Sequence, residues 1–215
     1  VVENSAVPAC CITPPDTLGY FPPKLVDYNP DEARRLLAEA GYPNGDGWPG
    51  VEILYNTQEA HRKIAVAIQQ MWKSELGIDV TIANQEWKVY LDAVTQIDFQ
   101  VARRGWIGDY VDANNFLDMF ITGGGNNNTH YGDPVYDDLI LYKAPKATTR
   151  EERYALFTQA ETMLMEEMPI IPLYTYTSKH LIHPSVEGMY ANLMDSLNLK
   201  YVKLVPGRTL PEALR

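Results

Sequence analysis

The sequence predicts an α/β fold in which helices flank a central sheet. Strand-like alternation and helix-like periodicity follow one another in the order β-α-β-α-β between residues 51 and 104. The connections between these segments are short enough to stack helices on a sheet. The chain has 215 residues and is 46% hydrophobic, which is sufficient to bury a core without a disulfide or a metal.

The first predicted helix covers residues 30–40 and follows a proline-rich segment. Asn29 is a good N-cap, Pro30 suits the first helical position, and Gly41 is the expected stop. Residues 1–29 have no periodicity, so we expect them to form an extended connector.

Further elements follow in order along the chain. In the first half we expect strands at 51–55, 78–84 and 98–104, and helices at 59–76 and 86–94. In the second half we expect helices at 114–121, 135–143 and 149–168, and strands at 170–176 and 179–183.

Local signals refine the second half. Thr149 and Glu152 have the spacing of a capping box, and Pro172 restricts its strand to an edge or a bulge. We expect a polar loop at residues 122–134 and a tail at residues 205–215. We therefore expect one α/β domain over residues 30–204, with a single core.

Composition excludes several classes of protein. The formal net charge is −10 and the pI about 4.8, opposite to what a nucleic-acid binder needs. No apolar run is long enough to span a membrane. The start VVENSAVPACC lacks the features of a signal peptide and resembles the middle of a longer protein. The adjacent Cys10 and Cys11 form no metal site, and whether either is paired stays open.

The segment RRGWIGDY, residues 103–110, is the strongest candidate site. It follows a predicted strand, at the sheet edge where open α/β folds bind ligands. Arg103 and Arg104 should point to opposite faces, and a guanidinium suits a carboxylate. Trp106 offers an apolar platform and Asp109 a carboxylate. The alternative is an edge strand with solvated arginines, a half-buried Trp106 and Asp109 capping the turn.

His61 and Asn56 are a second candidate pair, at the end of the neighbouring strand. His61 lies in the first turn of the helix that follows this strand. The helix dipole disfavours a cation there, so the position suits a neutral imidazole or a bound anion. A solvated helix residue is the alternative for His61, and a helix cap is the alternative for Asn56.

No catalytic motif is present, so we expect no enzyme, cofactor or metal. The chain has no GxSxG, HExxH or P-loop sequence. Asp109 and Asp112 are close in sequence, as in a glycosidase pair, and Trp106 suits a sugar. A carbohydrate-active or carbohydrate-binding domain that uses Trp106 and Asp109 is therefore the alternative function.

Several long segments resemble the C-terminal lobe of bacterial periplasmic oligopeptide-binding proteins, the substrate-binding subunits of ABC peptide importers. They are YNTQEAHRKIAVAIQQMWKSELGIDVTIANQEWKVYLDA, FQVARRGWIGDY, EARRLLAEAGY, NNTHY and PIIPLYTYTSKHLIHPSVEGMY. The resemblance runs in order from about residue 7 to about residue 204. It implies a single lobe of a type II periplasmic-binding-protein fold, with a mixed central sheet flanked by helices.

This resemblance implies a periplasmic, non-catalytic protein that carries short peptides to an inner-membrane ABC permease. It also implies that the N-terminal lobe of the same protein is absent from this chain. The peptide is expected to add as a strand, held by main-chain bonds and by charge pairing at its termini. The implied ligand-binding residues are Asn56, His61, Arg103, Gly105, Trp106, Ile107 and Asp109.

Each of these residues takes a role from the resemblance. Arg103 and His61 resemble the groups that bind the peptide's C-terminal carboxylate, and Asn56 lies in the same neighbourhood. Asp109 resembles the partner of the α-amino group. The backbone of Gly105 and Ile107 is expected to bond to the peptide, while Trp106 lines a side-chain pocket.

Two residues depart from the family's pattern. Arg104 stands where a small residue is expected and adds a charge at the rim. Val94 stands where some members have a further basic residue, so the preferred peptide length stays open. Relatives also bind dipeptides, murein fragments, nickel complexes or haem, so the fold alone does not name the ligand.

Overall fold

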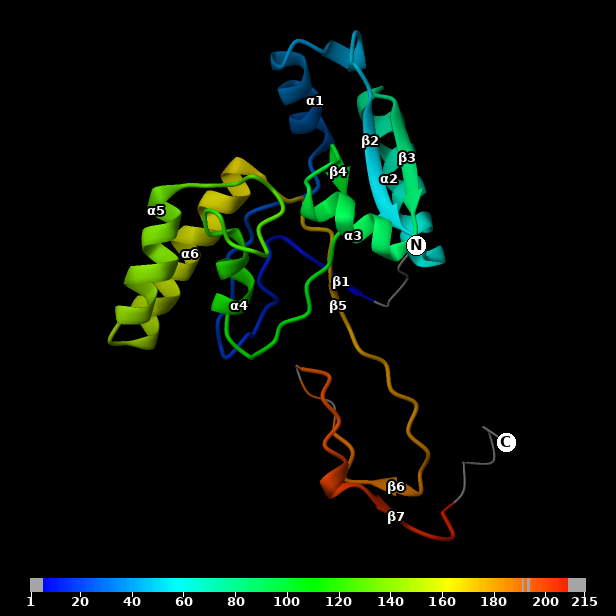
Figure 1. The fold of residues 1–215 in the computed structure, drawn as a ribbon, viewed down its shortest axis with the longest axis vertical. Coiled ribbons are helices and arrows are strands. Elements are labelled where there is room, and N and C mark those ends of the chain that lie inside the picture. Colours follow the sequence, from blue (N-terminus) through cyan, green and yellow to red (C-terminus); the bar gives the residue numbers. More distant parts are fainter. Residues whose placement is uncertain (1–5, 191, 193, 209–215) are drawn as a thin grey trace.

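Figure 1 shows the chain as a computed structural model, which describes residues 6–190, 192 and 194–208. Its strands are β1 (Ala6–Pro8), β2 (Val51–Asn56), β3 (Val80–Gln85), β4 (Val101–Ala102), β5 (Tyr174–Tyr176), β6 (Val186–Glu187) and β7 (Lys203–Leu204). Its α-helices are α1 (Pro30–Glu39), α2 (Glu59–Leu76), α3 (Trp87–Thr95), α4 (Asn114–Leu117), α5 (Pro134–Asp137) and α6 (Arg150–Glu167). A π-helix, Asp138–Lys143, continues α5, and short 3₁₀ turns lie at Pro43–Gly45, Asp118–Phe120, Ala144–Lys146 and Leu199–Tyr201.

Strands β2, β3 and β4 form a parallel sheet in the order β3-β2-β4. Ile53 of β2 is opposite Ile82 of β3 and Val101 of β4. Strand β4 covers only two residues, although the backbone N–H of Arg103 extends its ladder by donating to the carbonyl oxygen of Leu54 at 2.8 Å. The expected β-α-β-α-β order is confirmed.

The two helices between these strands pack on opposite faces of the sheet. Ile53 and Tyr55 point into one cluster, which contains residues of α2, and Leu54 points into another with Tyr90 and Val94 of α3. A strand alternates its side chains between faces, so a central strand covered on both sides is apolar at consecutive positions. This explains the unbroken apolar run in β2.

The helix ends follow the local sequence signals. The side chain of Asn29 accepts the backbone N–H of Glu32 at 3.1 Å, and Gly77 ends α2 in a left-handed conformation with φ of 74°. Thr149 caps α6 by accepting the N–H of Glu152 at 3.1 Å. The carboxylate of Glu152 reaches back to the N–H of Thr148, one residue earlier than the expected partner in a capping box.

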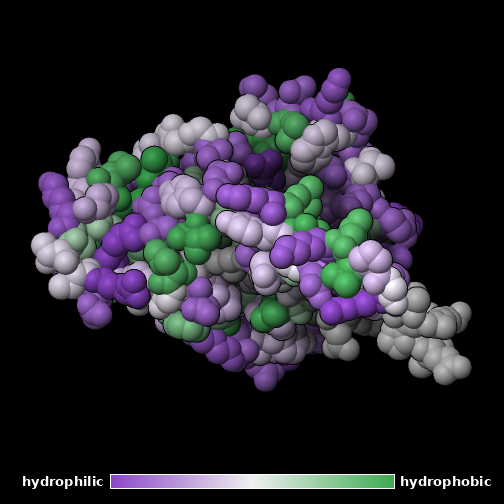
Figure 2. Space-filling view, turned by 90° about the horizontal axis from the view of Figure 1, so that it is seen from below, coloured by the Kyte–Doolittle hydropathy of each residue, from purple (hydrophilic) through white to green (hydrophobic). Residues whose placement is uncertain are grey.

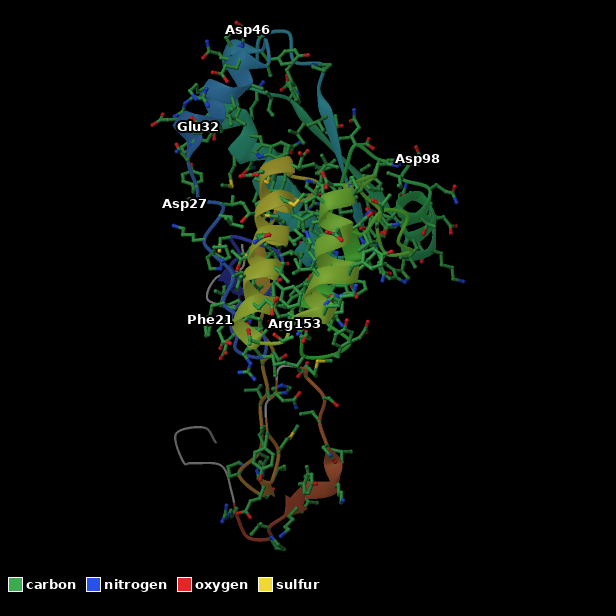
Figure 3. All side chains as sticks on the ribbon, turned by 90° about the vertical axis from the view of Figure 1, so that its left-hand side faces the viewer. Phe21, Asp27, Glu32, Asp46, Asp98 and Arg153 are labelled. Carbon is green, nitrogen blue, oxygen red and sulfur yellow. The ribbon has the colours of Figure 1, made fainter. Side chains whose placement is uncertain are left out.

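A separate cluster lies between the remaining helices. It is formed by residues of α4, α5, the π-helix and α6. In Figure 3 the yellow-green helix formed by α5 and the π-helix runs beside the yellow α6, with Arg153 near the start of α6. Phe157 and Leu164 of α6 and Tyr136 of α5 are fully buried in it. The buried hydrophobic residues thus form three clusters, and the expectation of a single core is corrected.

Residues 9–20 pack against α6 and are part of this cluster. Thr13, Thr17 and Tyr20 are each 1% exposed, and Tyr20 belongs to the cluster itself. Glu161 of α6, also buried, accepts hydrogen bonds from the segment. The segment has no helix, as expected, but its burial corrects the idea that it only connects.

The last part of the chain pairs in two places. Strand β5 begins two residues after Pro172 and pairs antiparallel with β1, with Val7 opposite Thr175. Strands β6 and β7 pair antiparallel in an arm, residues 177–208, that extends away from the helices (Figure 1). The parallel and antiparallel pairings therefore lie in separate sheets, and the α/β class is confirmed.

The expected strand at 179–183 is wrong, because this part of the arm has no strand and Leu181 is fully exposed. An alternating pattern gives a strand only where a neighbouring edge and a core are available. The arm carries other exposed apolar side chains, and in Figure 2 green side chains lie in several groups between purple ones. The predicted tail is described only to residue 208, and residues 209–215 lie outside the described residues.

Among the described residues, none of the helices is both long and apolar enough to cross a membrane.

Candidate functional site

Arg103 lies where β4 ends and is held from the opposite side by β5. Its guanidinium Nη2 donates to the hydroxyl of Tyr174 at 3.3 Å and also to the hydroxyl of Tyr176. The guanidinium carbon stands 5.8 Å from the centre of the Tyr176 ring. These contacts are made by one nitrogen and leave the rest of the guanidinium fork for a ligand.

His61 and Asn56 come together at the end of β2. Nδ1 of His61 lies 2.8 Å from Oδ1 of Asn56, so this nitrogen carries the proton and Nε2 is the free acceptor in the neutral ring. Partial burial lowers the pKa of His61 below its usual 6.5, and the charge of Arg103 lowers it further. A negative group between His61 and Arg103 would relieve this repulsion.

The segment from Arg104 to Asp109 runs past β4 without pairing. Among the described residues, none donates to or accepts from its backbone groups. Gly105 lies against β5: a Cβ at this position would come 2.9 Å from the hydroxyl oxygen of Tyr176. Ile107 is 76% exposed. This segment forms no strand itself, but its backbone groups are free to pair with one, and we call it the open strand edge.

Trp106 anchors this segment to the helical cluster. Its indole Nε1–H donates to Oδ1 of the buried Asn115 of α4 at 2.8 Å, and its ring packs against the cluster. The indole is half-buried, so only part of it can face a ligand. A polar group satisfied within the fold also fixes the direction of the ring.

Asp109 is exposed at the far end of the segment and joins none of the ion pairs among the described residues. Burial raises the pKa of the nearby Asp118, and the charge of Asp109 raises it further. Two carboxylates close enough to repel favour a cation between or beside them.

Asp112 is already engaged, which weakens the glycosidase alternative. Its two carboxylate oxygens accept from the guanidinium of Arg153 in α6 at 2.6 and 3.0 Å. A bidentate pair of this kind holds a chain segment in place and leaves no free acid for catalysis. Asp109 therefore stands without its proposed catalytic partner.

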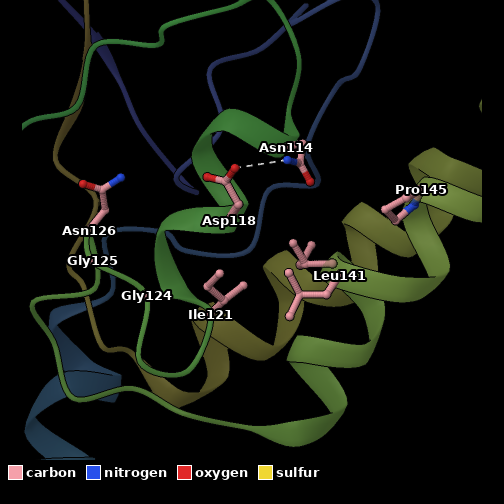
Figure 4. A pocket seen from close by; sticks show the side chains of 9 residues that line it. Asn114, Asp118, Ile121, Gly124, Gly125, Asn126, Leu141 and Pro145 are labelled. Carbon is pink, nitrogen blue, oxygen red and sulfur yellow. Dashed lines mark hydrogen bonds between the residues drawn. The ribbon is translucent and has the colours of Figure 1, made fainter.

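A hollow of about 360 Å³ lies outside the predicted site (Figure 4). It opens between α4, residues 121–126 and the π-helix, and Asn114 Nδ2 donates to Asp118 Oδ2 at 3.1 Å on its wall. None of the residues predicted from the sequence lines it. Within the described part of the chain, no group of three His, Cys, Asp or Glu side chains is placed to hold a metal ion.

The structure therefore brings Asn56, His61 and Arg103 to one end of an open strand edge and leaves Asp109 at the other. Sequence reasoning missed Tyr174 and Tyr176, which hold Arg103. Their alternation in the strand was a visible signal, but their contact with Arg103 needs β5 to lie beside β4, and no local pattern gives that.

A comparison with protein families matches residues 1–128 to the bacterial extracellular solute-binding proteins, family 5 Middle. The match covers more than half of the chain. The chain belongs to this family. Family 5 is a family of extracellular solute-binding proteins.

Individual proteins are similar to this chain over most of its length. The periplasmic oligopeptide-binding protein OppA of Escherichia coli (strain K12) is 38% identical over 177 residues, which cover 82% of this chain and 32% of OppA. The Escherichia coli murein tripeptide binding protein MppA has a TM-score of 0.80 at 35% identity, covering 92% of this chain and 40% of MppA. The chain spans roughly a third of the length of the curated relatives that it matches.

One of the similar solved structures contains a peptide. OppA of Haemophilus influenzae, in complex with RPPGFSPFR, has a TM-score of 0.78 at 32% identity, covering 93% of this chain and 40% of that protein. These likenesses confirm the type II periplasmic-binding-protein fold that the sequence resemblance implied.

Proposed function

We propose that this chain is the C-terminal lobe of a periplasmic peptide-binding protein that supplies an ABC importer. The observation that carries the proposal is the open strand edge from Arg104 to Asp109, with cationic groups at one end and a carboxylate at the other. The names of OppA and MppA, and the peptide in the Haemophilus influenzae complex, support the same ligand class.

The peptide adds to this edge as a strand. The free backbone groups of Gly105 and Ile107 bond to its main chain, which gives affinity without reading the peptide's sequence. The six-residue run from Arg104 to Asp109 spans at most about 20 Å when fully extended, so a peptide of about six residues or fewer can place its two termini at the two ends of this run.

Charge pairing at the two ends fixes the direction of the peptide. Arg103 and His61 take the C-terminal carboxylate, which relieves the repulsion that lowers the pKa of His61. Asp109 takes the α-amino group. Hydrogen bonds to charged groups contribute roughly 1.5–3 kcal/mol each, so a peptide bound in reverse or with a blocked terminus loses much of its affinity.

A second lobe of the same protein closes over the peptide and completes the binding protein, which then docks on an inner-membrane permease. The site described above is open on one side, and closure of two lobes about a hinge is the usual way to bury such a ligand. The protein binds and delivers its ligand without catalysis.

Substitution of Asp109 by Asn, in a complete binding protein that contains this chain, tests the proposal. We expect Asp109→Asn to weaken free-amino tripeptides at least roughly tenfold and N-acetylated tripeptides far less, because only the free amine makes the charge-assisted bond. Isothermal titration calorimetry measures both affinities.

Asp46→Asn is the matched control, because Asp46 is exposed and lies at the far end of the molecule from the arm (Figure 3). Equal losses for free and acetylated peptides would remove the role of Asp109. Binding of oligosaccharides instead of peptides would overturn the proposed function.

A further inference from the structure

Arg104 is the residue of the candidate site to which no function has yet been assigned. Its side chain is exposed, whereas the neighbouring Arg103 is partly buried between tyrosines. Among the described residues, no ion pair includes Arg104. Arg103 faces the tyrosines of β5, and because successive side chains of an extended segment point to opposite faces, we expect Arg104 to face the side of α3.

Arg104 directly follows a contact with α3, because the backbone carbonyl of Arg103 accepts the hydroxyl of Tyr90. Burial raises the pKa of the Tyr90 hydroxyl, and the charges of Arg104 and Arg103 both oppose this rise. The hydroxyl of Tyr90 donates to the backbone carbonyl of Arg103, so its proton is used. The oxygen lone pairs of this hydroxyl remain available to orient the guanidinium of Arg104.

Tyr90, which contacts the backbone of Arg103, belongs to a pair of stacked aromatic rings. Tyr90 is 2% exposed, and its ring is nearly parallel to that of Trp87, with an interplanar angle of 21° and ring centres 5.9 Å apart. Trp87 is 52% exposed. A partly exposed aromatic pair next to the backbone of residue 103 offers an apolar surface to the stem of a ligand side chain, and a guanidinium offers a charge to its anionic end.

Among the described residues, no acidic side chain forms an ion pair with Arg104, and the acidic residue that begins the neighbouring α3 has another role. Glu86, at the start of α3, accepts the backbone N–H of Lys88 at 2.9 Å and caps the helix. The chain as a whole has a net charge of −10, so an unpaired guanidinium at the rim of the site is a local exception to its charge. An exposed cation without a partner attracts an anionic ligand.

We propose that Arg104 binds a side-chain carboxylate of the bound peptide and makes the site prefer Asp or Glu at one peptide position. This inference rests on the proposed peptide-binding function and adds a side-chain preference to it. A peptide strand added along residues 104–109 also alternates its side chains between the two faces. One subset of its side chains therefore lies on the α3 face with Arg104, opposite the terminal carboxylate at Arg103.

The test uses a complete binding protein that contains this chain and a set of alanine-based tripeptides and tetrapeptides. Each peptide carries a single Glu, and its pair carries Gln at the same position. We expect one position at which Glu binds roughly three- to tenfold more tightly than Gln, a modest ratio because the pair is partly exposed to solvent. Isothermal titration calorimetry measures the ratio.

Substitutions of Arg104 test whether this residue causes the ratio of Glu to Gln affinity. Arg104→Ala should reduce this ratio to about one, while Arg104→Glu should reverse the preference and favour Lys at that position. Arg150→Ala is the control, because it removes an exposed arginine at the start of α6, away from the edge. This control should leave the ratio intact.

Results that contradict the role of Arg104 differ from results that contradict the proposed function. If peptides bind but no position prefers Glu, or if Arg104→Ala leaves the ratio unchanged, the inference is wrong and the proposed function stands. If Arg104→Ala changes only the ratio between C-terminal acids and amides, Arg104 serves the terminal carboxylate and the side-chain assignment is overturned. If no peptide binds, the proposed function itself fails.

Discussion

At the scale of single residues, the site depends on side chains whose pKa or orientation is set by their neighbours. His61 is kept neutral by burial and by Arg103, and its Nδ1 is turned toward Asn56. Arg103 is in turn oriented by two tyrosines of β5. A histidine in this setting changes its protonation when an anion arrives, so ligand binding and pH are linked.

We expect the affinity for peptides with a free C-terminal carboxylate to increase as the pH falls from about 7.5 toward about 5.5. The pKa of His61 lies below 6.5 in the free protein, and a bound carboxylate raises it, so binding takes up a proton between the two values. Calorimetry in buffers of different ionisation enthalpy measures this uptake. In His61→Gln the uptake should vanish, and an unchanged uptake would exclude His61 as its source.

At the scale of elements, the helices were predictable because their signals are local. The caps at Asn29 and Thr149 and the stop at Gly77 lie within a few residues of the backbone groups that they satisfy. The packing of residues 9–20 on α6 was not predictable. It depends on Glu161, which accepts the N–H of Thr13 at 2.8 Å across 148 positions, and hydropathy assigns a glutamate to the surface.

The buried Glu161 also accepts the hydroxyl of Tyr20 at 2.9 Å, and it makes a stability prediction possible. Glu161→Ala leaves the N–H of Thr13 without its acceptor, leaves the hydroxyl of Tyr20 only the longer contact of 3.5 Å with Thr158, and opens a cavity. We therefore expect it to lower the free energy of unfolding by roughly 2–4 kcal/mol. Glu166→Ala removes an exposed carboxylate from the same helix and should change it by less than about 0.5 kcal/mol. Urea unfolding of the chain measures both.

Glu161→Gln separates charge from hydrogen bonding. Burial raises the pKa of Glu161 in the folded state, so its contribution to stability is complete below about 4.5 and declines as the pH rises through the folded value. The stability of Glu161→Gln relative to the unmodified chain should therefore increase between about pH 4 and about pH 7. A difference independent of pH would show that Glu161 is not a titrating buried group.

At the scale of the whole molecule, the site lies where two packed regions meet. Residues 103–113 lead from the parallel sheet to the cluster around α4 and α6, and Trp106 and Asp112 attach this connection to the second region. The order of the sheet followed from periodicity and short connections. The structure of the arm could not be predicted in this way. Its expected strand at 179–183 has no neighbouring strand among the described residues, and β6 and β7 form through pairing between segments far apart in the sequence.

We expect residues 1–215 to unfold in one cooperative transition and to bind peptides more weakly than the micromolar range. The helices and the sheet have their own buried clusters, whereas the site encloses its ligand from one side only. Thermal unfolding followed by circular dichroism, and calorimetric titration with a tripeptide, check these statements. A gradual melt would contradict the first, and micromolar binding by this chain alone would contradict the second.

The pairing of β1 with β5 has a consequence for how this unit can be handled as a module. Ala6 lies opposite Tyr176, so the chain enters and leaves the unit formed by residues 9–173 at neighbouring points. Such a unit adds little loop-closure entropy to a host protein, since its two ends are already together. We therefore expect that it can be exchanged between relatives, with both junctions placed in the paired strands β1 and β5.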